Sequence, residues 1–194
     1  MPGQHESQHD MLQNWKRNSN IAVWLATIHQ RGIVVMCRKY WGTQAFGLPC
    51  FFALLLMMAW AAFSRDLFMY IWIAVWLACF LKRRMEAVRI EGQVDSRYDG
   101  YSFDAMRYCN SEATAKRVVE PILVAILGAI VYWLYTRAGL SPYGLPYYLL
   151  TGAFTLPLVE GVKQAAWKKR LRDMRDAQLE NEMSVRDFND QYGR

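Results

Sequence analysis

The residues best suited to chemistry in this sequence are two glutamates that flank its last pair of apolar segments. Glu120 stands in VVEP and Glu160 in LVEG. Sixteen residues separate Glu120 from Thr136, and sixteen separate Gly144 from Glu160. If the segments between them are antiparallel helices, both carboxylates lie at one depth. Carboxylates in proximity raise the pKa of one member, so such a pair can bind a cation or relay protons.

The same glutamates also have a structural interpretation, which the sequence favours. Glu120 precedes Pro121 at the start of an expected helix, where a negative charge interacts favourably with the helix dipole. Glu160 has Lys163, or Lys116 from the neighbouring helix, as a partner for an ion pair. Under this interpretation the two carboxylates stabilise helix ends and bind no ion.

Two threonines complete the candidate cation or proton site. Thr151 and Thr155 fall on one face of an expected helix, beside Gly152. Small and hydroxylated residues on such a face permit close helix packing more often than they line a pore. Together with Glu120 and Glu160 they are nevertheless the candidate lining of an ion path.

Other groupings that would indicate catalysis or metal binding are missing from the sequence. The four cysteines, at positions 37, 50, 79 and 109, form no CxxC pair and no metal-ligand spacing. There is no nucleophile–base pair, no Gly-rich phosphate loop and no intramembrane zinc motif. The sequence therefore predicts that the protein is not an enzyme, with no catalytic residue, no metal and no cofactor.

The elements that must position these residues are long apolar blocks separated by charged ones. Uncharged blocks cover residues 48–63, 67–81, 121–135 and 145–159, while residues 82–117 and 160–194 are rich in charge. Hydrophobic residues make up 54% of the chain and aromatic residues 14%. This segregation is typical of a protein in a lipid bilayer, because lipid excludes charge and water excludes long apolar runs.

The charged pair Arg65–Asp66 decides how the first two blocks are arranged. As one helix, residues 48–81 would be about 51 Å long, well beyond a hydrocarbon core of about 30 Å. Arg65 and Asp66 would then lie near the bilayer centre, at a cost of roughly 2.5–3.5 kcal/mol each. A turn at Ser64–Asp66 moves both charges to an interface, so we expect a helical hairpin. Each arm is short, and a re-entrant hairpin also fits.

The second pair of blocks repeats this design. Residues 121–135 and 145–159 flank the turn-rich sequence TRAGLSPYG. Pro121 and Pro146 lie near the starts of their blocks, where proline favours the beginning of a helix. Pro157 lies deep in the fourth block, where it should kink or end the helix.

The distribution of positive charge orients the predicted bundle. Residues 1–46, 82–117 and 160–194 hold 5, 8 and 8 of the 23 Lys and Arg, and the two turns hold one each. By the positive-inside rule both termini lie in the cytoplasm. We therefore predict an all-α integral membrane protein of a bacterial-type cytoplasmic (inner) membrane, with four transmembrane helices as two short hairpins and amphipathic cytoplasmic helices.

The complete expected organisation has six parts. Residues 21–41 are apolar but are interrupted by His29, Gln30 and Arg31, which favours an in-plane interfacial helix, with a cytoplasmic packing element as the alternative. The other parts are a polar, disordered N-terminus over 1–20, a first hairpin over 45–84, a cytoplasmic connector over 85–117, a second hairpin over 118–161 and a cytoplasmic charged helix over 162–194.

Basic residues near the bilayer predict contact with lipid headgroups. The residues concerned follow the second apolar block or begin the last helix: Lys82, Arg83, Arg84, Lys168, Lys169, Arg170 and Arg172. The last helix also carries Trp167, Leu171 and Met174 at one edge, continued by Leu179 and Met183 only after a slip, which is too irregular for a committed coiled coil.

These features favour a small, non-catalytic assembly or anchoring subunit of a larger, oligomeric membrane complex. Its expected partners are the bilayer and either further copies or other membrane or cytoplasmic subunits, with no nucleic acid. The alternative is an oligomeric ion channel or transporter with a path near Glu120, Glu160, Thr151 and Thr155.

Overall fold

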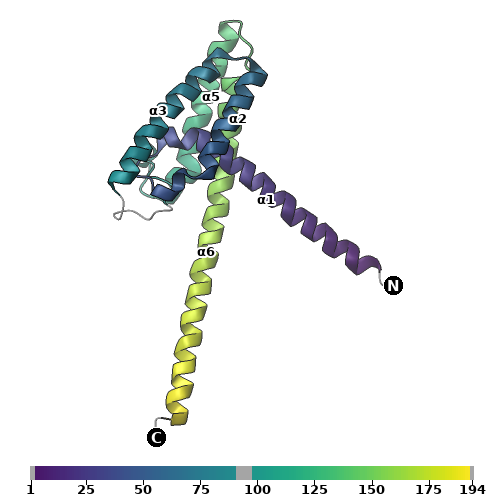
Figure 1. The fold of residues 1–194 in the computed structure, drawn as a ribbon, viewed down its shortest axis with the longest axis vertical. Helices are drawn as coiled ribbons and strands as arrows, with labels where there is room; N and C mark the ends of the chain where they lie inside the picture. The colour runs from purple at the N-terminus through teal and green to yellow at the C-terminus, as the bar shows by residue number, and fades with distance from the viewer. Residues whose placement is uncertain (1–2, 91–97, 193–194) are drawn as a thin grey trace. The chain divides into compact units, whose positions relative to one another are not determined.

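The computed structural model describes residues 3–90 and 98–192. In these ranges the chain is helical, as predicted, and contains no β-strand, only one isolated bridge between Lys39 and Tyr101. The elements (Figure 1) are α1 (Gly3–Cys37), η1 (Thr43–Phe46), α2 (Leu48–Ser64), α3 (Leu67–Arg89), η2 (Ala105–Arg107), α4 (Glu112–Thr114), η3 (Ala115–Val119), α5 (Glu120–Arg137) and α6 (Leu145–Tyr192). The chain forms two compact units, residues 1–159 and residues 160–194.

Helix α1 differs from the expectation in two ways. It begins at Gly3, so a helix covers the segment that the sequence predicted to be disordered. No proline or glycine interrupts residues 4–31, and a helix once formed extends at little cost through such a sequence. The structure assigns most of residues 21–41 to the same helix.

The C-terminal half of α1 is a core helix and not a surface one. Ile28, Ile33, Val34 and Val35 are buried, and α1 contacts both α2 and α3. Burial of every residue over 28–35 does not fit a helix in the plane of a membrane surface and favours the alternative of a packing element. The cytoplasmic position of that element stays a prediction. The three polar residues that interrupt this apolar run, residues 29–31, are themselves buried. His29 lies within hydrogen-bond distance of the carbonyl of Tyr148 and Arg31 Nη2 donates to Asp99, whereas Nε and Nη1 of Arg31 have no hydrogen-bond partner among the described residues.

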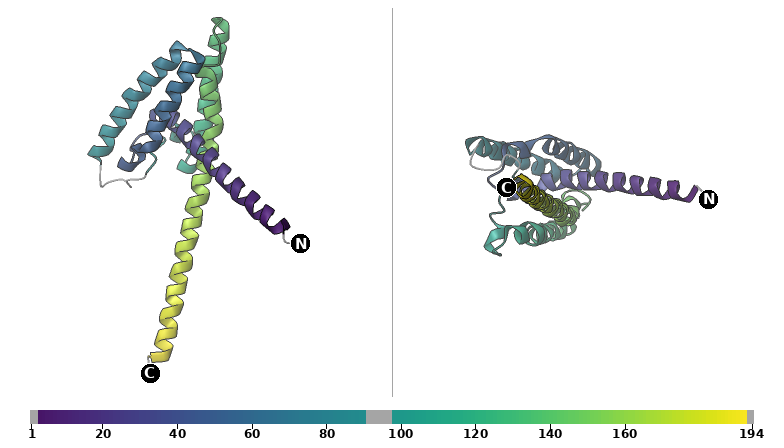
Figure 2. Two further views of the ribbon diagram at one scale, coloured as in Figure 1. Left: turned by 45° about the vertical axis from the view of Figure 1, so that its right-hand side comes forward. Right: turned by 90° about the horizontal axis from the view of Figure 1, so that it is seen from below.

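The chain reverses between α2 and α3 at the charged pair. Helix α2 starts with Pro49 in its first turn and ends at Ser64, and Arg65 follows in the left-handed conformation with φ 52°. Asp66 then caps α3 by accepting a hydrogen bond from the backbone N–H of Phe68 at 3.0 Å. The two helices run beside each other in both views of Figure 2 and bury Met57 and Met69.

Two helical segments are long and apolar enough to cross a membrane. They are Thr43–Ser64 and Glu112–Arg137, and only 28% of the most apolar part of each is buried. The core helix of a water-soluble protein would instead be mostly buried. This supports membrane association, at the level of two candidate spans.

Helix α6 continues through Pro157, so the proline does not end the helix, and one helix covers both the fourth apolar block and the charged tail. Proline lacks an N–H, so the carbonyl of Ala153 has no helical donor at this position, but the helix continues on both sides of Pro157. Residues 145–159 of α6 belong to the first unit and residues 160–192 to the second.

Candidate functional site

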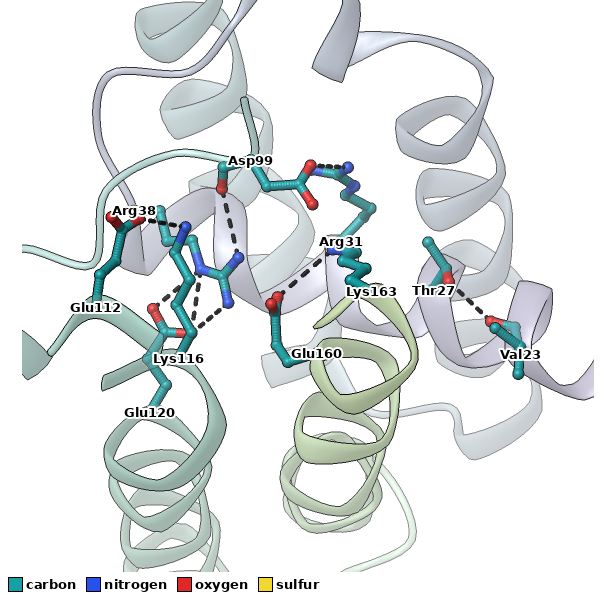
Figure 3. A network of polar contacts seen from close by, with 10 residues as sticks. All are labelled: Val23, Thr27, Arg31, Arg38, Asp99, Glu112, Lys116, Glu120, Glu160 and Lys163. Carbon is teal, nitrogen blue, oxygen red and sulfur yellow. Dashed lines mark hydrogen bonds and ion pairs between the residues drawn. The ribbon is translucent and has the colours of Figure 1, made fainter. Parts of the chain in front are cut away.

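Among the described residues of the first unit, the most deeply buried charges form an ion pair between the end of α1 and the start of α5. Arg38 directly follows α1, and its Nε lies 3.0 and 3.1 Å from Glu120 Oε1 and Oε2. Its Nη2 donates to Glu120 Oε2 at 2.6 Å, which completes a two-pronged contact (Figure 3). The side chains are 0% and 4% exposed. Such a fork-shaped contact fixes orientation as well as charge.

A second ion pair lies beside the first. Arg31 Nη2 is 2.5 Å from Asp99 Oδ1, and the guanidinium of Arg31 lies 4.9 Å from the ring centre of Trp41. Arg38 Nη1 donates to the backbone carbonyl of Asp99 at 3.4 Å, and Trp41 Nε1 donates to the backbone carbonyl of Arg38 at 3.1 Å. Two ion pairs from three regions of the chain are thus joined through Arg38 and Asp99, and both arginines contact the buried Trp41.

Backbone contacts hold the connector against the segment after α1. Lys39 N–H donates to the carbonyl of Tyr101 at 2.9 Å, and Gly42 N–H donates to the carbonyl of Tyr98 at 2.9 Å. Gly100 lies between them with φ +78°, and a Cβ there would stand 2.8 Å from Trp41 and 3.0 Å from Arg38. Glycine is required at this position both by its backbone angle and by the close approach of the tryptophan.

The short helical segment before α5 adds a third polar group. Lys116 Nζ is 2.6 Å from Glu112 Oε1, and the hydroxyl of Tyr98 donates to the same oxygen. Burial favours the protonated form of Glu112, but the hydrogen bonds from Lys116 and Tyr98 outweigh it, so the pKa of this carboxyl is lowered. The pKa of Tyr98 is raised, by burial and by its bond to Glu112. The contacts therefore stabilise the Glu112 carboxylate in its charged form and do not make it a reactive group.

The geometry of this buried polar cluster, Arg31, Arg38, Asp99 and Glu120, indicates a structural role. Each acid faces an arginine, and Glu120 accepts from two nitrogens of Arg38, so its carboxylate is engaged. In the described part of the chain no group of three or more His, Cys, Asp or Glu could hold a metal ion. All four cysteines are free thiols, and burial together with the charge of Glu120 raises the pKa of Cys37 to about 12.

Glu160, the other predicted carboxylate, belongs to the second unit. Its Oε1 is 3.5 Å from Lys163 Nζ, one turn further along α6 (Figure 3). This is one of the two ion pairs that the structural interpretation named. That Glu120 and Glu160 lie at one depth stays a prediction.

The two threonines of the candidate ion path turn their hydroxyls back onto their own helix. Thr151 Oγ1 donates to the carbonyls of Tyr147 and Tyr148 at 2.8 and 3.1 Å, and Thr155 Oγ1 donates to the carbonyl of Gly152 at 3.0 Å. Such bonds satisfy a hydroxyl inside a helix without water or a permeating ion. They fit helix packing better than a polar lining.

The basic residues predicted to contact lipid all lie on helix surfaces or ends. Lys82 and Arg84 are exposed near the end of α3, whereas Arg83 pairs with Glu86 at 2.8 Å. The four basic residues of residues 168–172 are exposed on α6. Their contact with headgroups stays a prediction.

Sequence reasoning missed a second polar centre, which lies where α3 begins and α5 ends. Asp66 caps α3 and also accepts from the N–H of Leu145, the first residue of α6, at 2.8 Å. The hydroxyl of Tyr135 donates to both its oxygens, and a Cβ on Gly144 would lie 1.9 Å from Asp66 Oδ2. One carboxylate therefore joins three helices. The only sequence signal was an acid placed just before a helix.

His29 is buried in the first unit and does not lie at a surface. Its Nε2 is 3.0 Å from the carbonyl of Tyr148, and its ring stacks at 6.3 Å on Trp60. Burial lowers the pKa of His29, and the bond to Tyr148 offsets part of this effect. The histidine therefore packs as a neutral ring.

No protein-family model, curated protein or solved structure matches this chain.

Proposed function

We propose that this chain is a small polytopic protein of a cytoplasmic membrane that acts as a non-catalytic assembly or anchoring subunit of a larger complex. The observation that carries this proposal is the apolar outer surface of the first unit. Phe63, Leu67 and Phe154 are 91%, 70% and 77% exposed, and similar residues continue along α2, α3, α5 and the first part of α6. Water-soluble monomers rarely expose so much contiguous apolar surface.

A bilayer explains this surface better than a protein partner, because it faces outward from four different helices. We infer four spans, with α3 ending at the interface through Lys82–Arg84, and the first part of α6 crossing despite Pro157. The turns at Arg65 and Arg137 then face outward, and the connector, both termini and the charged end of α6 lie in the cytoplasm.

The polar contacts inside the first unit favour a structural subunit over a channel. Within the described residues of the first unit, the charged side chains of the core pair with one another, and the threonine hydroxyls bond to their own helix. This leaves the connector and the charged end of α6 as the surfaces on which other subunits would dock.

Cysteine labelling tests the topology. A membrane-impermeant maleimide should label Ser64→Cys and Ser141→Cys from outside intact cells, while native Cys109 should react only after the membrane is opened. Labelling of Cys109 from outside would overturn the orientation.

Partner retention tests the role as a subunit. Deletion of residues 163–194 should remove co-purifying proteins while the labelling of Ser64→Cys stays unchanged, which shows that insertion is intact. An unchanged set of partners would contradict the proposal.

The channel alternative has its own test, which is ion flux through purified protein in liposomes. We expect no flux above that of empty liposomes. Flux that Glu120→Gln or Glu160→Gln abolishes would replace the subunit proposal with the transport one.

A further inference from the structure

Over its described residues, 160–192, the second unit is one helix. It carries a regularly spaced apolar face that is hard to see in the sequence because Leu179 and Met183 lie off this spacing. From Trp167 the chain continues with alternate steps of four and three residues, the spacing of a coiled-coil seam. The residues at these steps, here called the tail face, are Trp167, Leu171, Met174, Gln178, Asn181, Val185 and Phe188.

The apolar members of this face are open to solvent. Trp167, Leu171, Met174, Val185 and Phe188 are 46–62% exposed, and residues 160–192 of α6 are the only helix of the second unit in the described chain. A single helix cannot bury such a face by itself. Two polar residues, Gln178 and Asn181, occupy the middle of the face and divide it into two apolar ends.

The charges of the same helix divide at the same place. Residues 163–175 hold six Lys or Arg and one Asp, whereas residues 176–190 hold five Asp or Glu and one Arg. A second copy in antiparallel orientation therefore sets a basic half against an acidic half at both ends. A parallel copy would set like charges together along the whole length.

We propose that the tail face pairs with the tail face of a second copy of this chain in antiparallel orientation. The proposal names one partner for the subunit of the previous subsection, and it rests on that function because one bilayer holds both copies. Both tails then leave the bilayer on the same side, so the antiparallel pair has to lie along the membrane surface. In the register that centres the polar residues, Leu171 faces Phe188, Met174 faces Val185, and Gln178 faces Asn181 of the second copy. Leu171, Met174, Val185 and Phe188 thus each meet an apolar residue, and the polar residues meet each other.

The positions beside the seam agree with this register. In antiparallel coiled coils the residues that follow the seam positions meet their equivalents, so Arg175 would face Glu182 of the other copy, twice by symmetry. In a parallel pair, Lys163 would face Lys168 and Arg170 would face Arg175. Opposite charges therefore favour the antiparallel pair, and like charges oppose the parallel one.

Disulfide cross-linking of the full-length protein in membrane vesicles tests the pairing. With the antiparallel register, the two copies of residue 174 stand about 16 Å apart along the axis, too far for a disulfide. We expect Met174→Cys and Val185→Cys each to give only the background of the parent protein. Co-expression of the two variants with different tags should give a cross-linked heterodimer that reducing agent dissolves.

Charge exchange provides the matched control. Arg175→Glu, made in both cross-linking chains, should reduce the heterodimer about fivefold, because two attractions become repulsions. The double exchange Arg175→Glu and Glu182→Arg should restore it. Arg172→Glu changes the charge equally but lies off the tail face, so it should leave the yield unchanged.

Three outcomes would overturn the pairing. A dimer from Met174→Cys alone would indicate parallel helices, and the absence of a heterodimer would indicate that the tail binds headgroups or another protein. The third outcome is an equal decrease of the heterodimer yield with Arg172→Glu and with Arg175→Glu. Labelling of Ser64→Cys in the same vesicles is independent of the tail. Failure of the pairing is thereby distinguished from failure of the membrane proposal.

Discussion

The hydroxyl of Tyr135 lies 3.0 and 2.8 Å from the two carboxylate oxygens of Asp66, although 69 residues separate them in the chain. The same carboxylate accepts from the N–H groups of Phe68 and Leu145. It therefore accepts hydrogen bonds from the starts of α3 and α6 and, through Tyr135, also from the end of α5. The acid that marks a turn in the sequence holds together one end of the first unit.

Removal of this carboxylate should destabilise the protein more than removal of any one of its donors. We expect Asp66→Ala to lower the free energy of unfolding by about 2–3 kcal/mol, since two helix caps and a tyrosine bond are lost. Tyr135→Phe should cost about 1 kcal/mol.

Thermal unfolding in detergent, followed by circular dichroism, measures both effects. Arg65→Gly is the matched control at the next position. Arg65 adopts φ 52°, which glycine accepts without strain, so this variant should be as stable as the parent or slightly more so. Equal losses for Asp66→Ala and Tyr135→Phe would show that the bonds from the N–H groups of Phe68 and Leu145 to Asp66 add nothing to stability.

The buried pair of Arg38 and Glu120 should behave as a unit. Glu120→Leu or Arg38→Met leaves one charge without its partner among side chains that are 0% and 4% exposed, at a cost of about 3–5 kcal/mol. The double variant Arg38→Met and Glu120→Leu removes both charges and should be less destabilised than either single variant. A double variant whose loss equals the sum of the two single losses would mean that the pair contributes nothing as a pair.

Gly100 should be sensitive to the smallest substitution. Gly100→Ala adds a Cβ 2.8 Å from Trp41 to a backbone with φ +78°, so we expect a loss of about 2–3 kcal/mol from strain and overpacking together. Gly139 has φ +69° but no atom within 4 Å of a Cβ, so Gly139→Ala isolates the strain at about 1 kcal/mol. Equal unfolding temperatures for the two variants would contradict the close packing of Trp41 on the connector.

Much of the helical framework follows from local features of the sequence. The apolar blocks starting at residues 48, 67, 121 and 145 begin within one residue of α2, α3, α5 and α6, because proline, an acidic cap or a charge marks each start. The turn at Arg65 and Asp66 is expected from the cost of charge in lipid, and α2 ends and α3 begins at this pair.

The parts that could not be predicted depend on contacts between distant residues. Arg38 meets Glu120 across 82 positions, and a single sequence contains no signal that joins them. The same holds for residues 29–31, which look like an interruption of an apolar run. Of these, His29 is accommodated in the core by the carbonyl of Tyr148 and Arg31 by the carboxylate of Asp99. The heptad spacing of the tail face, in contrast, was present in the sequence and was obscured by Leu179 and Met183.

His29 should make stability depend on pH in a known direction. Its pKa in the folded protein lies below the ordinary value of 6.5, because burial disfavours the imidazolium. The unfolded chain therefore binds the proton first as pH falls, and stability is lost progressively from about pH 6.5 downward. Above that range both states are neutral at this residue, and its contribution is fully present.

Unfolding temperatures at pH 7.5 and 5.5 measure this effect in the parent and in His29→Gln. The amide can still donate to the carbonyl of Tyr148 but does not titrate, so the variant should lose less stability between the two values than the parent does. The pKa of Glu112 is lowered from 4.5, so its own contribution is lost only at more acidic pH and does not overlap. An identical pH dependence in parent and variant would show that His29 is accessible to protons in the folded state and not buried between Trp60 and Tyr148.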